Sequence, residues 1–205
     1  MSSVAQEEDW ERHMRAGIAA QQRGDYEEAV EQTKAAFRVA EAFGHDDPRL
    51  ALTLNNLAEF HRALGRYPEA EPFARQALAI RERTLGAEHP DVATSLSTLG
   101  ALVHAQGRYP EAEPLLQRSI VIREKALGGV HPRLATSLNN LAALYADWGR
   151  YEEARVLWER TLEINEKVYG PKHPRTIHTA KNLANLYRAL GRNEDAERLL
   201  REHGQ

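Results

Sequence analysis

Hydrophobic positions along the chain recur with the spacing of an amphipathic helix. In the stretch 135–150 they stand at i, i+3, i+4 and i+7, which is one face of a helix, and the stretch 151–170 shows the same helical spacing. No segment alternates apolar and polar residues with the period of two that is typical of a half-buried strand. The pattern therefore predicts an all-α protein. The positions of the two stretches are Leu138, Leu141, Ala142 and Tyr145, and then Ala154, Trp158, Thr161 and Leu162.

The helical pattern returns with a period of 42 residues. Four glycines are spaced by this distance, and the octapeptide GRYPEAEP occurs twice, at 65–72 and at 107–114. A fixed period of this length indicates stacked copies of one helical unit. We expect a disordered tail at 1–8, followed by one domain over 9–205. The glycines are Gly65, Gly107, Gly149 and Gly191, and the copies are a divergent one at 9–50, full ones at 51–92, 93–134 and 135–176, and a truncated one at 177–205.

Each copy contains the signals of two antiparallel helices. Gly149 is expected to end the first helix of its copy, because helices commonly end in a left-handed residue and glycine adopts that conformation without strain. Gly170 is expected to end the second helix. Pro174 then begins the next helix, at a position where its missing N–H costs nothing. Each copy is therefore predicted to be a helix, a tight turn and a second helix.

The repeated unit resembles the tetratricopeptide repeat. That family has small residues at the eighth and twentieth positions, an aromatic residue near the eleventh and a bulky one near the twenty-fourth, and its usual unit has about 34 residues. The longer unit of this chain, with LNNLA, GRY-x-EAE, IRE(R/K) and G-x-x-HP, is similar to the kinesin light chain subclass. The resemblance implies a right-handed α-solenoid of stacked antiparallel helix pairs, acting as a non-enzymatic scaffold or adaptor. In the copy 135–176 the four positions hold Ala142, Ala154, Tyr145 and Trp158.

Composition narrows the classes of function. The chain has 205 residues with a net charge of −3 and no cysteine, so it lacks the basic excess of a nucleic-acid-binding protein and cannot form disulfides or thiolate metal sites. No apolar run approaches the length of about 20 residues that a membrane span needs. The N-terminus is polar and acidic and does not have the pattern of a signal peptide. We therefore expect a cytoplasmic protein with no nucleic-acid or membrane partner.

Three histidines recur in the dipeptide His-Pro, at His89, His131 and His173. Two ligands of one zinc ion lie within about 4 Å of each other, whereas equivalent residues of stacked helices are at least about 8–10 Å apart. The histidines are therefore interpreted as extended residues before a proline at the start of a helix. No metal ion or other cofactor is expected.

No catalytic motif occurs in the chain. The motifs H-E-x-x-H and G-x-S-x-G and the glycine-rich phosphate loops are absent, so no catalytic residue is assigned. Glu69 and Glu71 are expected in the exposed first turn of a helix, where carboxylates complement the helix dipole. The segments IRER at 80–83 and IREK at 122–125 are expected to be solvated helix ends, because each basic residue has a neighbouring glutamate.

The resemblance places the candidate binding surface on the first helix of each copy, which lines the concave groove of such an array. Asparagine recurs there, and its amide can both donate to and accept from a peptide backbone. Because asparagine is a poor helix former, its pairs at 55–56 and 139–140 either clamp an extended peptide or bond a neighbouring helix. We favour Asn55 and Asn139 for the ligand, with a partly structural role for Asn56 and Asn140. The candidate set is Met14, Ile18, Asn55, Asn56, Glu59, Arg62, Ser97, His104, Asn139, Asn140, Asp147, His178, Lys181, Asn182, Asn185 and Arg188.

The two ends of the predicted groove differ in polarity. Met14 and Ile18 are apolar at the N-terminal end, whereas Lys181 and Arg188 make the C-terminal end positive. We therefore expect the partner to be a protein with an acidic peptide segment.

A second hypothesis is a structural module that forms homo-oligomers through its terminal repeats. The last copy stops without a polar capping helix, and repeat arrays need capped ends. Under this hypothesis Leu186, Leu190 and Leu199 lie on an exposed end face and bind another copy of the chain.

Overall fold

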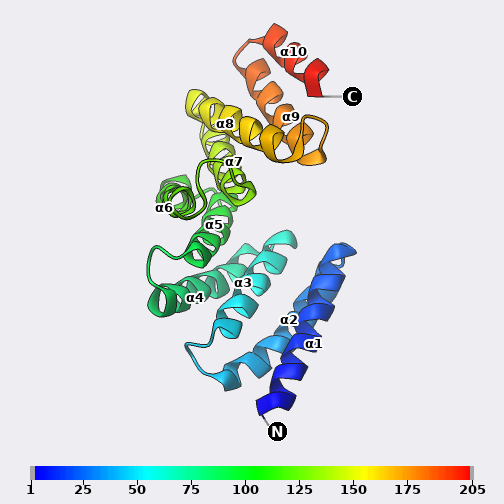
Figure 1. The fold of residues 1–205 in the computed structure, drawn as a ribbon, viewed down its shortest axis with the longest axis vertical. Coiled ribbons are helices and arrows are strands. Elements are labelled where there is room, and N and C mark those ends of the chain that lie inside the picture. The colour runs from blue at the N-terminus through cyan, green and yellow to red at the C-terminus, as the bar shows by residue number, and fades with distance from the viewer. Residues whose placement is uncertain (1–2, 204–205) are drawn as a thin grey trace. The chain divides into compact units, whose positions relative to one another are not determined.

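The computed structural model describes residues 3–203, and over this range the chain is all-α (Figure 1). These residues form ten α-helices and one short 3₁₀ helix, and no strand occurs among them. The predicted fold class, an all-α chain of consecutive helix pairs, is confirmed. The elements are α1 (Ser3–Gln22), α2 (Tyr26–Ala40), η1 (Glu41–Phe43), α3 (Pro48–Ala63), α4 (Tyr67–Leu85), α5 (Pro90–Ala105), α6 (Tyr109–Leu127), α7 (Pro132–Asp147), α8 (Tyr151–Tyr169), α9 (Pro174–Ala189) and α10 (Asn193–His203).

Helix α1 begins earlier than the sequence suggests. The stretch 1–8 was expected to be a disordered tail, but residues 3–8 belong to α1, so this expectation is wrong for them. One reason is a contact with the next repeat, since Arg49 of α3 forms an ion pair with Glu7 at 3.1 Å. Residues 1–2 of the expected tail and residues 204–205 of the last copy lie outside the described range.

The chain divides into two compact units, which are described separately. Unit 1 (Met1–Arg108) contains α1–α5, and unit 2 (Tyr109–Gln205) contains α6–α10. Within each unit every helix packs against the next one in the sequence. A helix in the middle of a unit therefore contacts both its partner within the repeat and a helix of the adjacent repeat. No helix in the described range is long and apolar enough to cross a membrane.

The helices of a repeat pack closely at the small residues that the repeat pattern predicts. In the first copy Gly17 occupies such a position, and a Cβ built there would lie 2.6 Å from Oγ1 of Thr33 on α2. A larger residue would therefore push the two helices apart. At the two small-residue positions of the other copies, the fully buried alanines are Ala58, Ala70, Ala112, Ala142, Ala154, Ala184 and Ala196.

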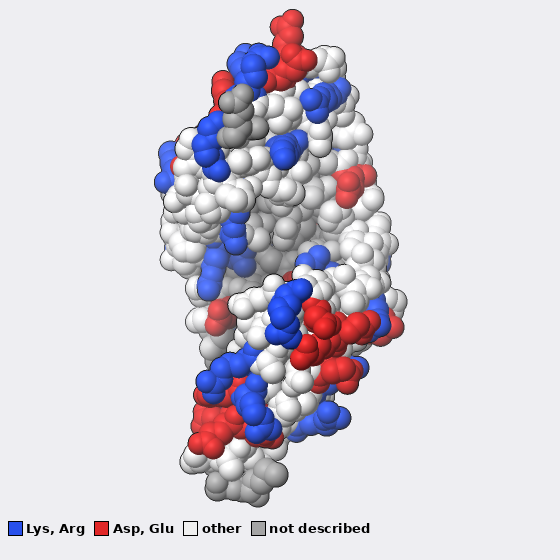
Figure 2. Space-filling model, turned by 90° about the vertical axis from the view of Figure 1, so that its right-hand side faces the viewer, with Lys and Arg blue, Asp and Glu red and all other residues white. Residues whose placement is uncertain are grey.

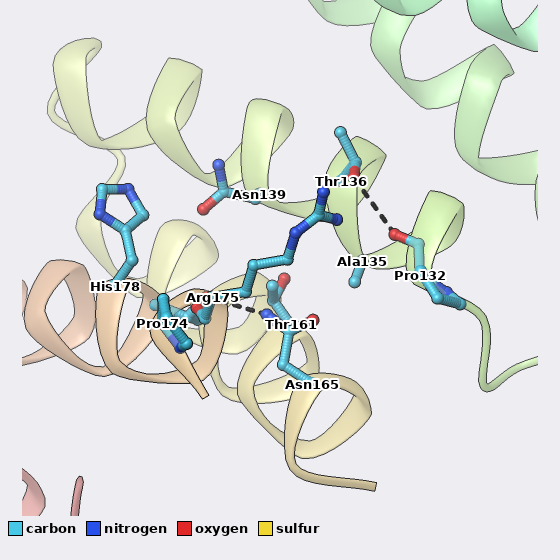
Figure 3. A pocket seen from close by; sticks show the side chains of 10 residues that line it. Pro132, Ala135, Thr136, Asn139, Thr161, Asn165, Pro174, Arg175 and His178 are labelled. Carbon is cyan, nitrogen blue, oxygen red and sulfur yellow. Dashed lines mark hydrogen bonds between the residues drawn. The ribbon is translucent and has the colours of Figure 1, made fainter. Parts of the chain in front are cut away.

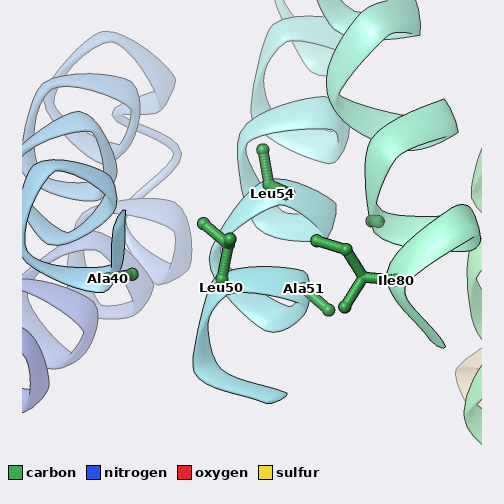
Figure 4. Packing of buried hydrophobic residues seen from close by; sticks show 6 residues of the cluster. Ala40, Leu50, Ala51, Leu54 and Ile80 are labelled. Carbon is green, nitrogen blue, oxygen red and sulfur yellow. The ribbon is translucent and has the colours of Figure 1, made fainter. Parts of the chain in front are cut away.

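Apolar side chains fill the space between consecutive helices. In unit 1 a cluster joins Ala40 of α2, Leu50 and Leu54 of α3, and Ile80 of α4 (Figure 4). Helix α3 thus buries side chains toward α2 and α4 at once. This arrangement explains why the first helix of a repeat is apolar around much of its circumference, since both neighbours remove its surface from water.

The His-Pro histidines are helix caps. In α5, α7 and α9 the Nδ1 atom of His89, His131 or His173 accepts the backbone N–H two residues later at 3.1–3.2 Å. Asp47 does the same for α3 with a carboxylate oxygen at 2.8 Å. The prediction of an extended residue before proline is confirmed, and the cap supplies an acceptor for a helix N–H that would otherwise lack one. Gly149 and Gly170, with φ of 80° and 87°, end their helices as predicted.

A buried hydroxyl recurs at one position in the first helix of every repeat after the first. Each hydroxyl accepts a hydrogen bond from a side chain of the preceding repeat, so the same polar contact links consecutive repeats within each unit. We call Thr53, Ser95, Ser137 and Thr179 the buried hydroxyl series, and all four are almost fully buried. The donors and distances are Trp10 Nε1 to Thr53 at 2.9 Å, Arg81 Nη1 to Ser95 at 2.8 Å, Arg123 Nη1 to Ser137 at 2.6 Å and Asn165 Nδ2 to Thr179 at 3.0 Å.

Arg81 and Arg123 are therefore not the solvated helix-end cations that IRER and IREK suggest. Both are buried, and each also donates to a backbone carbonyl, of Asp91 and Arg133 respectively. Burial lowers the pKa of Arg81, and burial together with the charge of Arg133 lowers the pKa of Arg123 to about 10. Both guanidinium groups still carry a charge at neutral pH. The expectation is wrong for these two arginines, because neighbouring charges in the sequence do not show which side of a helix faces the next repeat. It is confirmed for Arg83 and Lys125, which are exposed in the last turns of α4 and α6.

The repeated octapeptide joins repeats through its second glutamate. Glu71 accepts from Gln106 at 2.8 Å and from Arg108 at 2.7 Å, and in unit 2 Glu113 accepts from Arg150 at 2.9 Å. Burial alone would raise the pKa of Glu71, but hydrogen bonds from Gln106, Arg75 and Arg108 outweigh it and lower the pKa to about 2. Glu71 is therefore a largely buried link between repeats, which corrects its interpretation as an exposed first-turn carboxylate.

Removing one member of the buried hydroxyl series should destabilise the fold. Ser137→Ala deprives the buried Arg123 guanidinium of an acceptor, and we expect the free energy of unfolding to fall by roughly 1–3 kcal/mol. Urea unfolding measures this loss. Thr136→Ala is the matched control, because Thr136 is exposed and its hydroxyl donates within its own helix to Pro132. Equal losses in the two variants would show that the series is not a structural link.

Candidate functional site

In unit 1 most candidate binding residues are buried or already paired. Met14 is only 5 % exposed, and its sulfur lies 3.7 Å from the Thr53 hydroxyl. Glu59 and Arg62 form an ion pair with each other at 2.9 Å. The apolar N-terminal end expected for the groove is thus reduced to Ile18, because the Met14 side chain packs against the next repeat. Ser97 and Asn55 are buried, whereas Asn56 and His104 are half-buried and Ile18 is exposed.

Two polar side chains of α3 are buried without hydrogen-bond partners in the described structure. Asn55 is 6 % exposed and its Oδ1 has no donor, while His61 is 5 % exposed and neither ring nitrogen has a partner. The His61 ring packs against Phe73, with ring centroids 5.8 Å apart. Burial, and the charges of Lys34 and Arg66, lower the pKa of His61, so the ring is neutral in the folded chain. Both groups lower the stability of unit 1, because a buried polar atom without a partner has lost its water.

In unit 2 the candidate residues are accessible. The exposed ones on α9 follow one another at intervals of three or four residues, which places them along one side of the helix. Asn139 and Asn140 of α7 are half-buried, so part of each amide faces solvent. The exposed candidates are His178, Lys181, Asn185 and Arg188 on α9 and Asp147 on α7, and Asn182 is half-buried.

Two cavities lie between α7 and α9, and α8 contributes to the lining of both. The first has a volume of about 410 Å³, and Figure 3 shows Arg175 reaching across it toward Thr136. No carboxylate lines this cavity. The second, of about 360 Å³, is lined partly by Trp158 and Leu186 and is more apolar. We call these two cavities, together with His178, Lys181, Asn185 and Arg188 of α9, the unit 2 groove. The first cavity is lined by Pro132, Ala135, Thr136, Asn139, Thr161, Asn165, Pro174, Arg175, His178 and Thr179.

Helix α9 carries an unbalanced positive charge. Its sequence contains Arg175, Lys181 and Arg188 and neither aspartate nor glutamate. Within residues 3–203 none of the three forms an ion pair; Arg175 contacts the Tyr169 hydroxyl at 3.3 Å and Arg188 contacts Asn185 Oδ1 at 3.3 Å. The flanking helices differ, since Lys167 of α8 pairs with Glu163 and Arg198 of α10 pairs with Asp195. The groove therefore presents cations that the fold itself does not neutralise.

Trp158 and Arg175 belong to this groove, although neither was among the candidate binding residues. The sequence pattern assigns Trp158 to the bulky position of the second helix, which is a packing role. In the structure its Nε1 donates to Asn139 Oδ1 at 2.9 Å, so it contacts a candidate residue directly. Arg175 lies in the first turn of α9. The sequence does carry a signal for it, because this helix contains basic residues and no acidic residue that could pair with them.

The leucines that motivate the self-assembly hypothesis are not exposed. Leu186 and Leu199 are buried, and Leu190 is half-buried. Helix α10, which carries Leu199, packs on α9, which carries Leu186. The expected apolar end face is therefore absent at these residues.

Charges of both signs are interspersed over the face shown in Figure 2, and no broad patch of one sign covers it. Among the described residues no group of three or more histidine, aspartate or glutamate side chains is arranged to hold a metal ion. The unit 2 groove is lined by cations, amides and apolar side chains.

Comparison with known proteins agrees with this architecture. The sequence profile of the tetratricopeptide repeat matches residues 12–83, 49–125, 91–157 and 133–203. No curated protein sequence matches the chain. Among solved structures, the nearly identical TPR-like repeats of a putative kinesin light chain from Podosopora anserina are 30 % identical, with a TM-score of 0.78, over 94 % of this chain and 91 % of that one.

Two more distant structures share the fold alone. BtubC (BKLC) from P. vanneervenii is 22 % identical with a TM-score of 0.72, over 98 % of this chain and 90 % of that one. A Rap protein complexed with competence and sporulation factor is 15 % identical with a TM-score of 0.78, over 95 % of this chain and 54 % of that one.

The buried His61 makes the stability of unit 1 sensitive to acid. Its folded-state pKa lies below the value of about 6.5 in an unfolded chain, so the unfolded state binds more protons and stability falls as the pH drops below about 6.5. We expect the His61→Phe variant to lose less stability than the wild-type chain when the pH falls from about 7.5 to about 5.5, a range that spans the unfolded-state pKa of about 6.5. Thermal unfolding at each pH measures this loss. His45→Asn is the control, because His45 is exposed. An unchanged pH dependence in His61→Phe would contradict the role of His61.

Proposed function

We propose a partner-binding role from the premise that this chain belongs to the tetratricopeptide repeat family, with repeats similar to those of kinesin light chains. The protein is an adaptor without enzymatic activity, and its unit 2 groove binds an acidic peptide segment of a protein partner. The observation that carries this proposal is the charge of α9, whose Arg175, Lys181 and Arg188 have no ion-pair partner within the described residues.

The cations of α9 favour an anionic ligand. Neither Lys181 nor Arg188 has an ion-pair partner within the described residues, so an approaching carboxylate displaces water and, at Arg188, competes only with the Asn185 amide oxygen 3.3 Å away. Each such exposed pair contributes about 0–1 kcal/mol. Charge therefore gives the groove its selectivity and a salt-dependent association rate, and other contacts must supply much of the affinity.

The remaining contacts suit an extended peptide. Asn139, Asn182 and Asn185 present amide groups that can bond a peptide backbone whatever its side chains. The second cavity, with Trp158 and Leu186, accommodates an apolar side chain and gains about 25 cal/mol for each Å² of apolar surface that it buries. We therefore propose that the bound segment combines acidic residues with at least one apolar side chain.

The similar structures support the general statement that a protein of this fold can bind a partner. The Rap protein of the same fold was solved in a complex with competence and sporulation factor. The family is built from repeats that present an extended binding surface. The choice of unit 2 and of an acidic ligand rests on the α9 cations of this chain.

Selection from a random-sequence peptide library on the immobilised full chain tests the proposal. We expect enriched peptides to be acidic, and the double variant Lys181→Glu/Arg188→Glu to bind a selected peptide about tenfold or more weakly, because two attractive contacts become repulsive. Calorimetry measures the dissociation constants. The matched control is Lys167→Glu/Arg198→Glu, which reverses two exposed cations of unit 2 that are already paired with carboxylates.

Two results would overturn the proposal. One is the absence of any enriched peptide on the wild-type chain. The other is an equal effect of the two charge reversals on binding, because the paired and unpaired cations would then be equivalent to the ligand.

A further inference from the structure

The Trp158–Asn139 contact determines which atoms of the Asn139 amide are free. The indole Nε1–H can only donate a hydrogen bond, so the amide atom 2.9 Å away must be the oxygen. Trp158 is itself 6 % exposed and therefore holds its ring in one place. The orientation of the Asn139 amide is thus fixed by a neighbour that cannot accept its N–H groups.

The opposite atom of the amide is left for a ligand. Nδ2 carries two N–H groups, and the planar geometry of the amide directs it away from the Trp158 indole. Asn139 lines the first cavity together with Arg175 and His178 (Figure 3), and Nδ2 has no hydrogen-bond partner within residues 3–203. No acceptor of the described chain bonds these N–H groups, so water or a ligand has to supply one.

We propose that Trp158 is a positioning residue, which fixes Asn139 as a hydrogen-bond donor toward a carboxylate or a backbone carbonyl of the bound peptide. The proposal rests on the peptide-binding function of the unit 2 groove and names the hydrogen-bond character of one of its subsites. An unconstrained asparagine presents its oxygen and its nitrogen equally well. With Trp158 in place, the amide favours an acceptor and disfavours a donor at this point of the ligand.

Unit 1 shows the same position without the tryptophan. Asn55 is equivalent to Asn139 by the 42-residue period, and the position of Trp158 is occupied there by Ala74. Alanine has no side-chain donor, and Oδ1 of Asn55 is buried without a partner. The comparison indicates that the bulky position of the repeat decides whether the asparagine oxygen is satisfied within the fold.

Trp158 also has a packing role, which an experiment must separate from the positioning role. Its ring lines the second cavity, so Trp158→Ala would remove apolar surface as well as the donor. Trp158→Phe retains an aromatic ring and deletes the Nε1–H. Trp148→Phe is the matched control, because Trp148 packs against Tyr109 and Arg150 and does not line either cavity.

A double-mutant cycle on the full chain tests the proposal, with an acidic peptide selected on the wild-type protein as the probe. We expect Trp158→Phe and Asn139→Ala each to weaken binding about three- to tenfold, the worth of one hydrogen bond. The double variant should bind no more weakly than Asn139→Ala alone, because Trp158 acts through Asn139. A merely structural tryptophan would instead weaken binding by the same factor in both backgrounds, and that result would overturn the proposal.

Asn139→Asp tests the sign of the subsite. The aspartate still accepts from Trp158, but it presents an oxygen where the wild-type chain presents N–H groups. We expect it to bind the acidic peptide more weakly than Asn139→Ala does, and equal or tighter binding would overturn the proposal. If the wild-type chain selects no peptide, the proposed function fails and this inference fails with it. If the wild-type chain selects peptides but the cycle is additive, only the role of Trp158 is wrong.

Discussion

Consecutive repeats within each unit are held in register by a buried hydrogen bond to one hydroxyl. A buried hydroxyl or guanidinium that loses its hydrogen-bond partner is left desolvated and unpaired, which costs free energy. A shift of one repeat against the next would break this hydrogen bond and therefore destabilise the fold. The donors differ, from the Trp10 indole through Arg81 and Arg123 to the Asn165 amide, while the acceptor is always serine or threonine. The acceptor keeps its position in the repeat while the donor residue varies. This explains how repeats of diverging sequence keep one geometry.

This structural use of polar groups determines what is left for binding. Glu71 and Glu113 are satisfied by arginines of the next repeat, and Arg81 of IRER and Arg123 of IREK are buried. Helix α9 is an exception, because its cations have no carboxylate partner in the described chain. We therefore propose that recognition takes place on the first helices of unit 2, while the polar groups of the second helices mainly hold the fold together.

Much of the fold could be predicted from the sequence, because the 42-residue period and the Gly and Pro signals are local. The buried role of Arg81 and the ordered residues 3–8 could not, since both depend on a contact with another repeat. The candidate site shows the same limit. Asn55 and Asn139 both occur in the sequence LNNLA and cannot be told apart from it. They differ in the structure because Trp158 bonds the Asn139 oxygen, whereas the equivalent residue in the repeat of Asn55 is Ala74, which has no donor. The hydroxyl series itself was visible in the repeat alignment, but its significance appears only when the donors are located.

The central claim is that the unit 2 groove is the binding surface. The most direct test is a titration of the isotopically labelled full chain with a selected acidic peptide, followed by NMR of the backbone and side-chain amides. The account predicts that shifts concentrate on α7 and α9, including the side-chain amides of Asn139 and Asn185. Shifts confined to the surface of α8 around the exposed Val156, or to unit 1, would contradict it.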